Sequence, residues 1–354
     1  MRAASALICA SALLLAGCAS IGPPTVVRDR FDYVSALSDS WKRQTLLNLL
    51  KIRYADAPVF LDVTSVISAY SVGADVSVGG EIARPGRGDT FASVGAGAQY
   101  ADKPTITYQP LSGDKFARSL MAPIPISALL SLIQAGYPAD LVLRICVNSI
   151  NGIENDFGGP GNLRVGSPKF YELMTALRQS QAAGGSGFRT RSTKDKQTVV
   201  MFLRPSSEDA VAPSTGRIRE LLGLDPAARE FTVVYGSFSE PDGDIAILSR
   251  SVLQIMIDFA AQIDVPASDV AEGRVYRPER TAEQERMFPP LLKVRTGASP
   301  PEDAHAAVRY REQWFWIDDR DQPSKRALTL IMMVFSLTES APSQAAPLVT
   351  IPAR

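Results

Sequence analysis

Hydrophobic and polar residues alternate with a period of two along residues 72–82 and again along residues 92–100. Strict alternation of this kind predicts a strand with one apolar and one polar face. Between the two runs, residues 84–89 are polar and rich in glycine and include a proline, which is typical of a turn. The pattern therefore predicts a long amphipathic β-hairpin over residues 70–100.

The length and the two faces of this hairpin fit a strand pair that crosses a membrane. Residues 72–82 match the roughly 9–11 residues that a tilted transmembrane strand needs. The face expected to contact lipid comprises Tyr70, Val72, Ala74, Val76, Val78, Ile82, Val94 and Tyr100. The face expected to line a lumen comprises Asp75, Ser77, Glu81, Ser93 and Gln99. The two tyrosines at the base of the arms resemble the aromatic girdle of an interface.

Both arms of the hairpin are expected to be interrupted at the same level, just below its base. The apolar positions are odd-numbered over residues 59–63 and even-numbered from residue 72 onward. A change of parity inside a strand implies a bulge or a bend, which we place at residues 65–68. On the return arm, Pro104 cannot donate a hydrogen bond to a ladder and predicts a matching break at residues 102–104.

The rest of the chain mixes helical and strand patterns, and predicts an α+β body from residue 33 to residue 338 with a mostly antiparallel sheet and helices packed against it. Helices are predicted at residues 33–54, 127–135, 168–181, 251–263 and 324–337. Residues 141–150 and 307–317 each favour a strand, and residues 231–238 and 245–248 a hairpin around a Pro-Asp-Gly turn. Residues 339–354 form a tail rich in proline, alanine and serine.

The N-terminal residues have the layout of a secretory signal peptide. One arginine and an apolar run too short to span a membrane as a mature helix lead into Leu15-Ala16-Gly17-Cys18. This ending resembles the lipobox of bacterial lipoproteins, and the resemblance covers residues 1–18 only. The alternative is cleavage by the ordinary signal peptidase.

The lipoprotein resemblance implies that residues 1–17 are removed and that Cys18 becomes an acylated N-terminus, with palmitate among its chains. Ala19 and Ser20 follow, with no aspartate beside the cysteine, which implies sorting to the periplasmic side of the outer membrane. Residues 18–32 are then a tether. Cys146 is left as the only free thiol, expected to be a small buried hydrophobe without a disulfide.

The composition limits the kinds of partner and catalytic site that we expect for this chain. Lys+Arg and Asp+Glu are both 37 in the 354 residues, so bulk charge gives no reason to expect a nucleic-acid partner. Any His-based nucleophile system would have to use the single histidine, His305, which we expect at the surface. No cofactor or metal site is indicated.

The densest polar cluster follows two tryptophans and contains Asp318, Asp319 and Asp321. Paired acids beside aromatic residues could cleave glycans. The same residues fit the end of a strand followed by the N-cap and charged first turn of a helix, and this structural interpretation is favoured. No catalytic set is therefore assigned.

Three functions remain open on the sequence. The first is an oligomeric lipoprotein of an envelope assembly or export pore, in which each copy gives the hairpin's two strands to a shared β-barrel, since a lone hairpin would leave its edges unpaired in lipid. The second is a monomeric periplasmic scaffold that uses the hairpin as a protein-docking arm. The third is an envelope hydrolase that uses the aspartate cluster.

Overall fold

The computed structural model describes residues 22–67, 70–80, 92–159, 164–192, 197–205, 212–239, 243–276, 281–287 and 289–338. Cys18, Glu81, Ile82 and the C-terminal tail lie outside these residues. The chain divides into two compact units, which we call the body (Met1–Pro58 and Ala117–Arg354) and the hairpin unit (Val59–Phe116).

The first described element is the helix α2, Gly22–Arg53, which belongs to the body. It begins well before the predicted residue 33, so the expected tether over residues 18–32 is helical from Gly22 onward. Pro23 and Pro24 fall in the first turn, where a missing N–H costs nothing and the fixed φ suits a helix. The C-terminal part of α2 is buried through Leu46, Leu49 and Leu50 and packs on α8 (Val252–Ala261), β12 (Ala304–Tyr310) and α11 (Gln322–Thr338).

The larger sheet of the body has six strands in the order β6-β5-β10-β9-β8-β7. The strands are β5 Val147–Ile150, β6 Ile153–Glu154, β7 Ser186–Ser192, β8 Gln197–Leu203, β9 Glu230–Tyr235 and β10 Ile245–Ser249. Its single parallel pairing among the described strands joins β9 to β10. The predicted hairpin between these two strands is therefore wrong: the Pro-Asp-Gly turn is not followed by an antiparallel return, because β10 instead runs antiparallel to β5.

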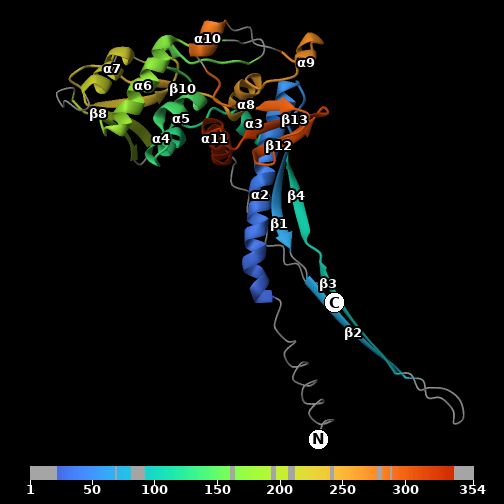
Figure 1. Ribbon diagram of the computed structural model, residues 1–354. Coiled ribbons are helices and arrows are strands. Elements are labelled where there is room, and N and C mark those ends of the chain that lie inside the picture. The colour runs from blue at the N-terminus through green and yellow to red at the C-terminus, as the bar shows by residue number, and fades with distance from the viewer. Residues whose placement is uncertain are drawn as a thin grey trace, which may run out of the picture. The chain divides into compact units, whose positions relative to one another are not determined.

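Helices pack against this sheet (Figure 1). They are α4 Ile126–Gln134, α5 Ala139–Cys146, α6 Pro168–Ala182 and α7 Ala212–Leu222. Leu143 of α5 and Leu173 of α6 lie with Met201 and Ile247 of the sheet around one small apolar space. The strand predicted over residues 141–150 is half correct, because its first part is the end of α5 and only β5 is strand.

A second, smaller sheet has the order β11-β13-β12, with β11 Arg295–Gly297 and β13 Gln313–Asp318. The predicted strand over residues 307–317 is two strands, which pair antiparallel across a tight turn. At this turn Arg311 and Glu312 have φ values of 46° and 67°, a left-handed conformation that periodicity does not reveal. The remaining short helices of the body are α3 Asp114–Met121, which starts in the hairpin unit, α9 Ala267–Ala271 and α10 Ala282–Met287.

The hairpin unit consists of two antiparallel ladders. β1 Phe60–Ile67 pairs with β4 Thr105–Leu111, and β2 Tyr70–Gly80 pairs with β3 Ala92–Asp102. The first ladder ends at the pair Ile67 and Thr105, and the second begins at Tyr70 and Asp102. The predicted interruption of both arms at one level is confirmed.

These elements make an α+β fold whose strand pairings are antiparallel apart from the one named above, as the sequence predicts. Among the residues that the structure describes, no helix is both long enough and apolar enough to cross a membrane.

Candidate functional site

The register of the β2–β3 ladder sorts its residues into two faces. Residues directly opposite one another in an antiparallel pair share a face. From residue 72 to residue 79, the even-numbered levels are Val72 with Tyr100, Ala74 with Ala98, Val76 with Ala96 and Val78 with Val94. Over the same stretch the odd-numbered levels are Gly73 with Gln99, Asp75 with Gly97, Ser77 with Gly95 and Gly79 with Ser93; a fifth odd-numbered level, Ser71 with Ala101, lies at the base. Apolar positions of one arm thus meet apolar positions of the other, as the two separate alternations predict.

Each of the four odd-numbered levels from Gly73 to Gly79 pairs one glycine with one polar residue. On the β3 side, Gly95 and Gly97 stand at two successive levels, so the middle of this strand carries no side chain on the polar face. Gly97 and Gln99 are exposed. Either a water-filled space or the close approach of another backbone would fit such a face. The sequence alone does not reveal this pattern, because it depends on which residues oppose each other.

The base of the ladder differs from the prediction in one respect. Tyr70 is opposite Asp102, so a carboxylate shares the even-numbered face with the tyrosine. Tyr100 is one level further along, opposite Val72. The apolar face therefore ends at the level of the two tyrosines. The predicted face residues Glu81 and Ile82 lie outside the described residues.

The two ladders of the hairpin unit have open edges. Among the described strands, β2 pairs with β3 alone and β1 with β4 alone. Every second residue of a strand in a two-stranded antiparallel pair directs its backbone N–H and C=O outward. Two eleven-residue strands with such edges form a template for further strand pairing.

A bulge in β1 keeps the apolar positions of the first ladder on one face. The register shifts between Val63 and Ser65, slightly before the predicted residues 65–68. The extra residue is Thr64, whose hydroxyl donates a hydrogen bond to the Thr107 carbonyl at 3.3 Å. Leu61 and Val63 before the bulge, and Val66 after it, are opposite Pro110, Tyr108 and Ile106, all even-numbered. Leu61, Ile106 and Tyr108 on this face are exposed.

The aspartates suggested for hydrolysis have separate structural partners. Asp318 forms an ion pair with Arg295 at 3.4 Å, and Asp319 with Lys325 at 2.6 Å. Asp321 accepts hydrogen bonds from the backbone N–H and the hydroxyl of Ser324, at 3.3 and 2.8 Å, in the first turn of α11. This is the capping role that the structural interpretation assigns to it. Within the described residues no group of three or more His, Cys, Asp or Glu side chains is gathered as a metal site.

The single histidine is less accessible than predicted. The His305 side chain is 16% exposed and its Nδ1 lies 3.6 Å from the Asp319 carboxylate. Burial, followed by the charges of Lys42 and Lys325, lowers the pKa of His305. The neutral imidazole is therefore favoured, and it packs where β12 begins. The buried Cys146 is as predicted, and burial raises the pKa of its thiol to about 12.

A buried polar network that the sequence did not suggest lies where α5, β5 and α8 meet. Arg250 is 1% exposed and donates to Asp258 at 3.0 Å and to Asn148 at 3.2 Å. The other oxygen of Asp258 accepts the Gly158 N–H at 2.7 Å. Asn148 also accepts a bond from Arg164, the pKa of which burial lowers. The one sign of this network in the sequence is Arg250, a single arginine between an apolar strand and an apolar helix.

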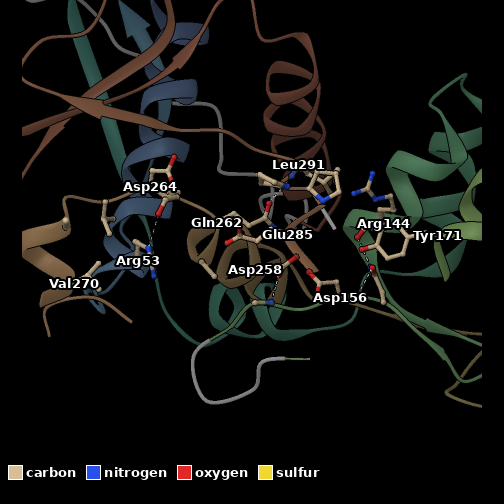
Figure 2. A pocket seen from close by; sticks show the side chains of 18 residues that line it. Arg53, Arg144, Asp156, Tyr171, Asp258, Gln262, Asp264, Val270, Glu285 and Leu291 are labelled. Carbon is tan, nitrogen blue, oxygen red and sulfur yellow. Dashed lines mark hydrogen bonds between the residues drawn. The ribbon is translucent and has the colours of Figure 1, made fainter. Parts of the chain in front are cut away.

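Asp258 of this network lines a cavity of about 480 Å³ inside the body, shown in Figure 2. Arg53, at the end of α2, lies at one end of this cavity and donates hydrogen bonds to the carbonyls of Ile263 and Tyr276. The cavity is not part of the hairpin unit and is a separate candidate for binding.

Comparison with known proteins finds no family model, no curated protein and no solved structure that matches the chain.

Proposed function

We propose that the chain is an outer-membrane lipoprotein on the periplasmic side, which assembles with further copies of itself into an envelope complex of the export-pore type. Each copy would contribute β2 and β3 to a shared β-barrel. The observation that carries the proposal is the β2–β3 ladder, which has two continuous eleven-residue strands, opposed apolar and polar faces, and open edges among the described strands.

The open edges are the reason for oligomerisation. A two-stranded hairpin is at best marginally stable in water. In hydrocarbon, each unpaired backbone N–H or C=O costs several kcal/mol, so only a closed arrangement persists there. Strands from neighbouring copies would pair with the outer edges of β2 and β3 and close them.

The dimensions of the ladder suit a membrane. Eleven residues at about 3.3 Å each extend about 36 Å, and a tilt of about 45° leaves about 25 Å along the membrane normal. This equals the apolar band of about 25 Å found on transmembrane barrels. The tyrosines and Asp102 at the base would lie at the interface, where such side chains are favoured.

The polar face would line the lumen of the barrel. With one glycine at each of the four levels from Gly73 to Gly79, the face carries few side chains, so the passage would be wide for its strand number. On these levels Asp75 would supply one negative charge per copy, and Glu81, predicted on the same face, lies outside the described residues. Acylation of Cys18 would hold each copy at the membrane that its hairpin enters.

A second function is favoured by the small size of the apolar side chains. Ala74, Ala96 and Ala98 occupy three of the eight positions on the four levels from Val72 to Val78, where lipid-facing strands would usually carry larger residues. Small residues on both faces allow another protein to pack closely on the hairpin. In this alternative the protein is a monomeric periplasmic scaffold and the open edge of β2 or β3 accepts a strand from a partner.

Imaging of the acylated protein, extracted in detergent, separates the two functions. The proposal predicts ring-shaped particles with a detergent collar, and monomers after residues 71–99 are replaced by a short Gly-Ser link. The deletion variant should still sediment with membranes through Cys18. A wild-type protein that is monomeric, and stays soluble when Cys18→Ser removes the anchor, would contradict the pore and favour the docking arm.

A further inference from the structure

The cavity of the body has the size and lining of a small-molecule site. Its volume of about 480 Å³ falls within the range of about 300–1,000 Å³ that is usual for ligand pockets. Residues from α2, α5, α6, α8, α9 and α10 line it, all within the body. Figure 2 shows Arg144 and Tyr171 at one end, with Arg53 and Asp264 at the other.

Two of the charged groups in the wall are already used by the fold. Both oxygens of Asp258 accept hydrogen bonds, from Gly158 and from Arg250. Arg53 donates to two backbone carbonyls. These groups shape the cavity, and their hydrogen bonds would have to break before they could bind a ligand.

Arg144 is different. It lies in the last turn of α5, and its guanidinium stands over the ring of Tyr171 at 5.2 Å from the ring centre. Its Nε is buried without a hydrogen-bond acceptor, and the side chain makes no ion pair within the described part of the chain. A buried donor without an acceptor is uncommon and costs about 1–3 kcal/mol. The Nη groups have no acceptor among the described residues either, and they are the donors that a ligand can reach.

Three further carboxylates line the same cavity, and one of them, Asp156, is half-buried. Asp264 and Glu285 are the other two, and both are exposed. Apolar side chains, among them Val265, Val270 and Leu291, contribute to the wall. The lining thus offers a half-buried cation, accessible carboxylates and apolar surface.

We propose that this cavity binds a zwitterionic ligand of the amino-acid or short-peptide class. The ligand's carboxylate pairs with Arg144, whose planar guanidinium suits two parallel hydrogen bonds to one carboxylate. Its ammonium group faces Asp264 and Glu285, and its aliphatic part contacts the apolar wall. This site goes beyond the pore and does not depend on it, because every residue that forms it belongs to the body.

Isothermal titration of the full chain with trialanine tests the proposal. We expect saturable binding at one site per chain, equally in wild type and in the variant that lacks residues 71–99. Trialanine amide, which lacks the carboxylate, and N-acetyl-trialanine, which lacks the ammonium group, should each bind at least about tenfold more weakly. These ligand changes need no mutation and so cannot be confused with misfolding.

Two variants assign the contact to Arg144. Arg144→Met, checked for an unchanged melting temperature, should lose about tenfold or more in affinity for trialanine but not for its amide. Arg178→Met is the matched control, because Arg178 is exposed on α6 and pairs with Asp140 outside the cavity lining. The proposal is overturned by the absence of saturable heat up to about 10 mM trialanine, or by a folded Arg144→Met variant that binds trialanine as wild type does.

Discussion

The body and the hairpin unit satisfy their polar groups in opposite ways. In the body, even the fully buried Arg250 has a carboxylate, an amide oxygen and backbone carbonyls as acceptors. In the hairpin unit, strands as long as any in the body form ladders only two strands wide in the described residues. The body thus provides partners for most of its buried charges, with Arg144 Nε as an exception, whereas the hairpin unit leaves backbone groups at its edges open to pairing with water or with another strand.

The largest effect on stability is expected from removing the cation of the buried ion pair in the body. Arg250→Met leaves Asp258 as a buried carboxylate without its cation, and should lower the free energy of unfolding by about 3–5 kcal/mol. Urea denaturation, followed by a signal that reports on the body, measures this loss in the free energy of unfolding. The double variant Arg250→Met with Asp258→Leu should recover part of the loss, because no charge is then left unpaired. Equal losses in the single and double variants would show that the pair is not the source of the stability.

The second prediction compares the effect of a lysine on each of the two faces of the hairpin. Val76 and Ser77 are neighbours in β2 at levels of opposite face. Val76→Lys should cost about 2–4 kcal/mol per copy if its face contacts the middle of a bilayer, whereas Ser77→Lys on the polar face should be tolerated. The measurement is the fraction of chains recovered as oligomers from membranes. Equal recovery of both variants would show that neither face contacts the middle of a bilayer.

The smallest effect on stability is expected from Asp56, an exposed carboxylate of the body. A hydrogen bond from Tyr310, followed by one from Arg311, lowers the pKa of Asp56 below its ordinary 3.8. The ionised carboxylate therefore favours folding above pH 3.8, and this contribution disappears as the pH falls through the lower, folded-state pKa. Solvent screens the pair, since the Asp56 side chain is 44% exposed.

Melting temperatures as a function of pH check this contribution. Asp56→Asn should melt slightly below wild type at pH 6, and the gap should close as the pH approaches about 2. Glu283→Gln, a change at an exposed acid of α10, serves as control. A gap that stays constant with pH would show that the Asp56 carboxylate acts through packing instead of charge.

What the sequence predicts well is local. The alternation in β2 and β3, the break at Pro104 and the helix opened by Pro168 each follow from a period or a backbone restriction within a few residues. The direction of β10 could not be predicted, because it is set by pairing with β5, nearly a hundred residues earlier. The Arg250 network and the one-glycine levels of the polar face also require contacts that only the fold brings together.

Hydrogen–deuterium exchange of the two strand segments, residues 70–80 and 92–102, shows whether neighbouring copies pair with the edges of β2 and β3. In the assembled protein in detergent, we expect slow exchange for nearly all amides of both segments, because neighbouring copies bond the outward N–H groups as well. The Val76→Lys variant, isolated as a monomer, should expose about half of them, as expected for a two-stranded pair. Rapid exchange of that same half in purified wild-type protein, at every protein concentration, would show that the edges stay open and would contradict the shared barrel.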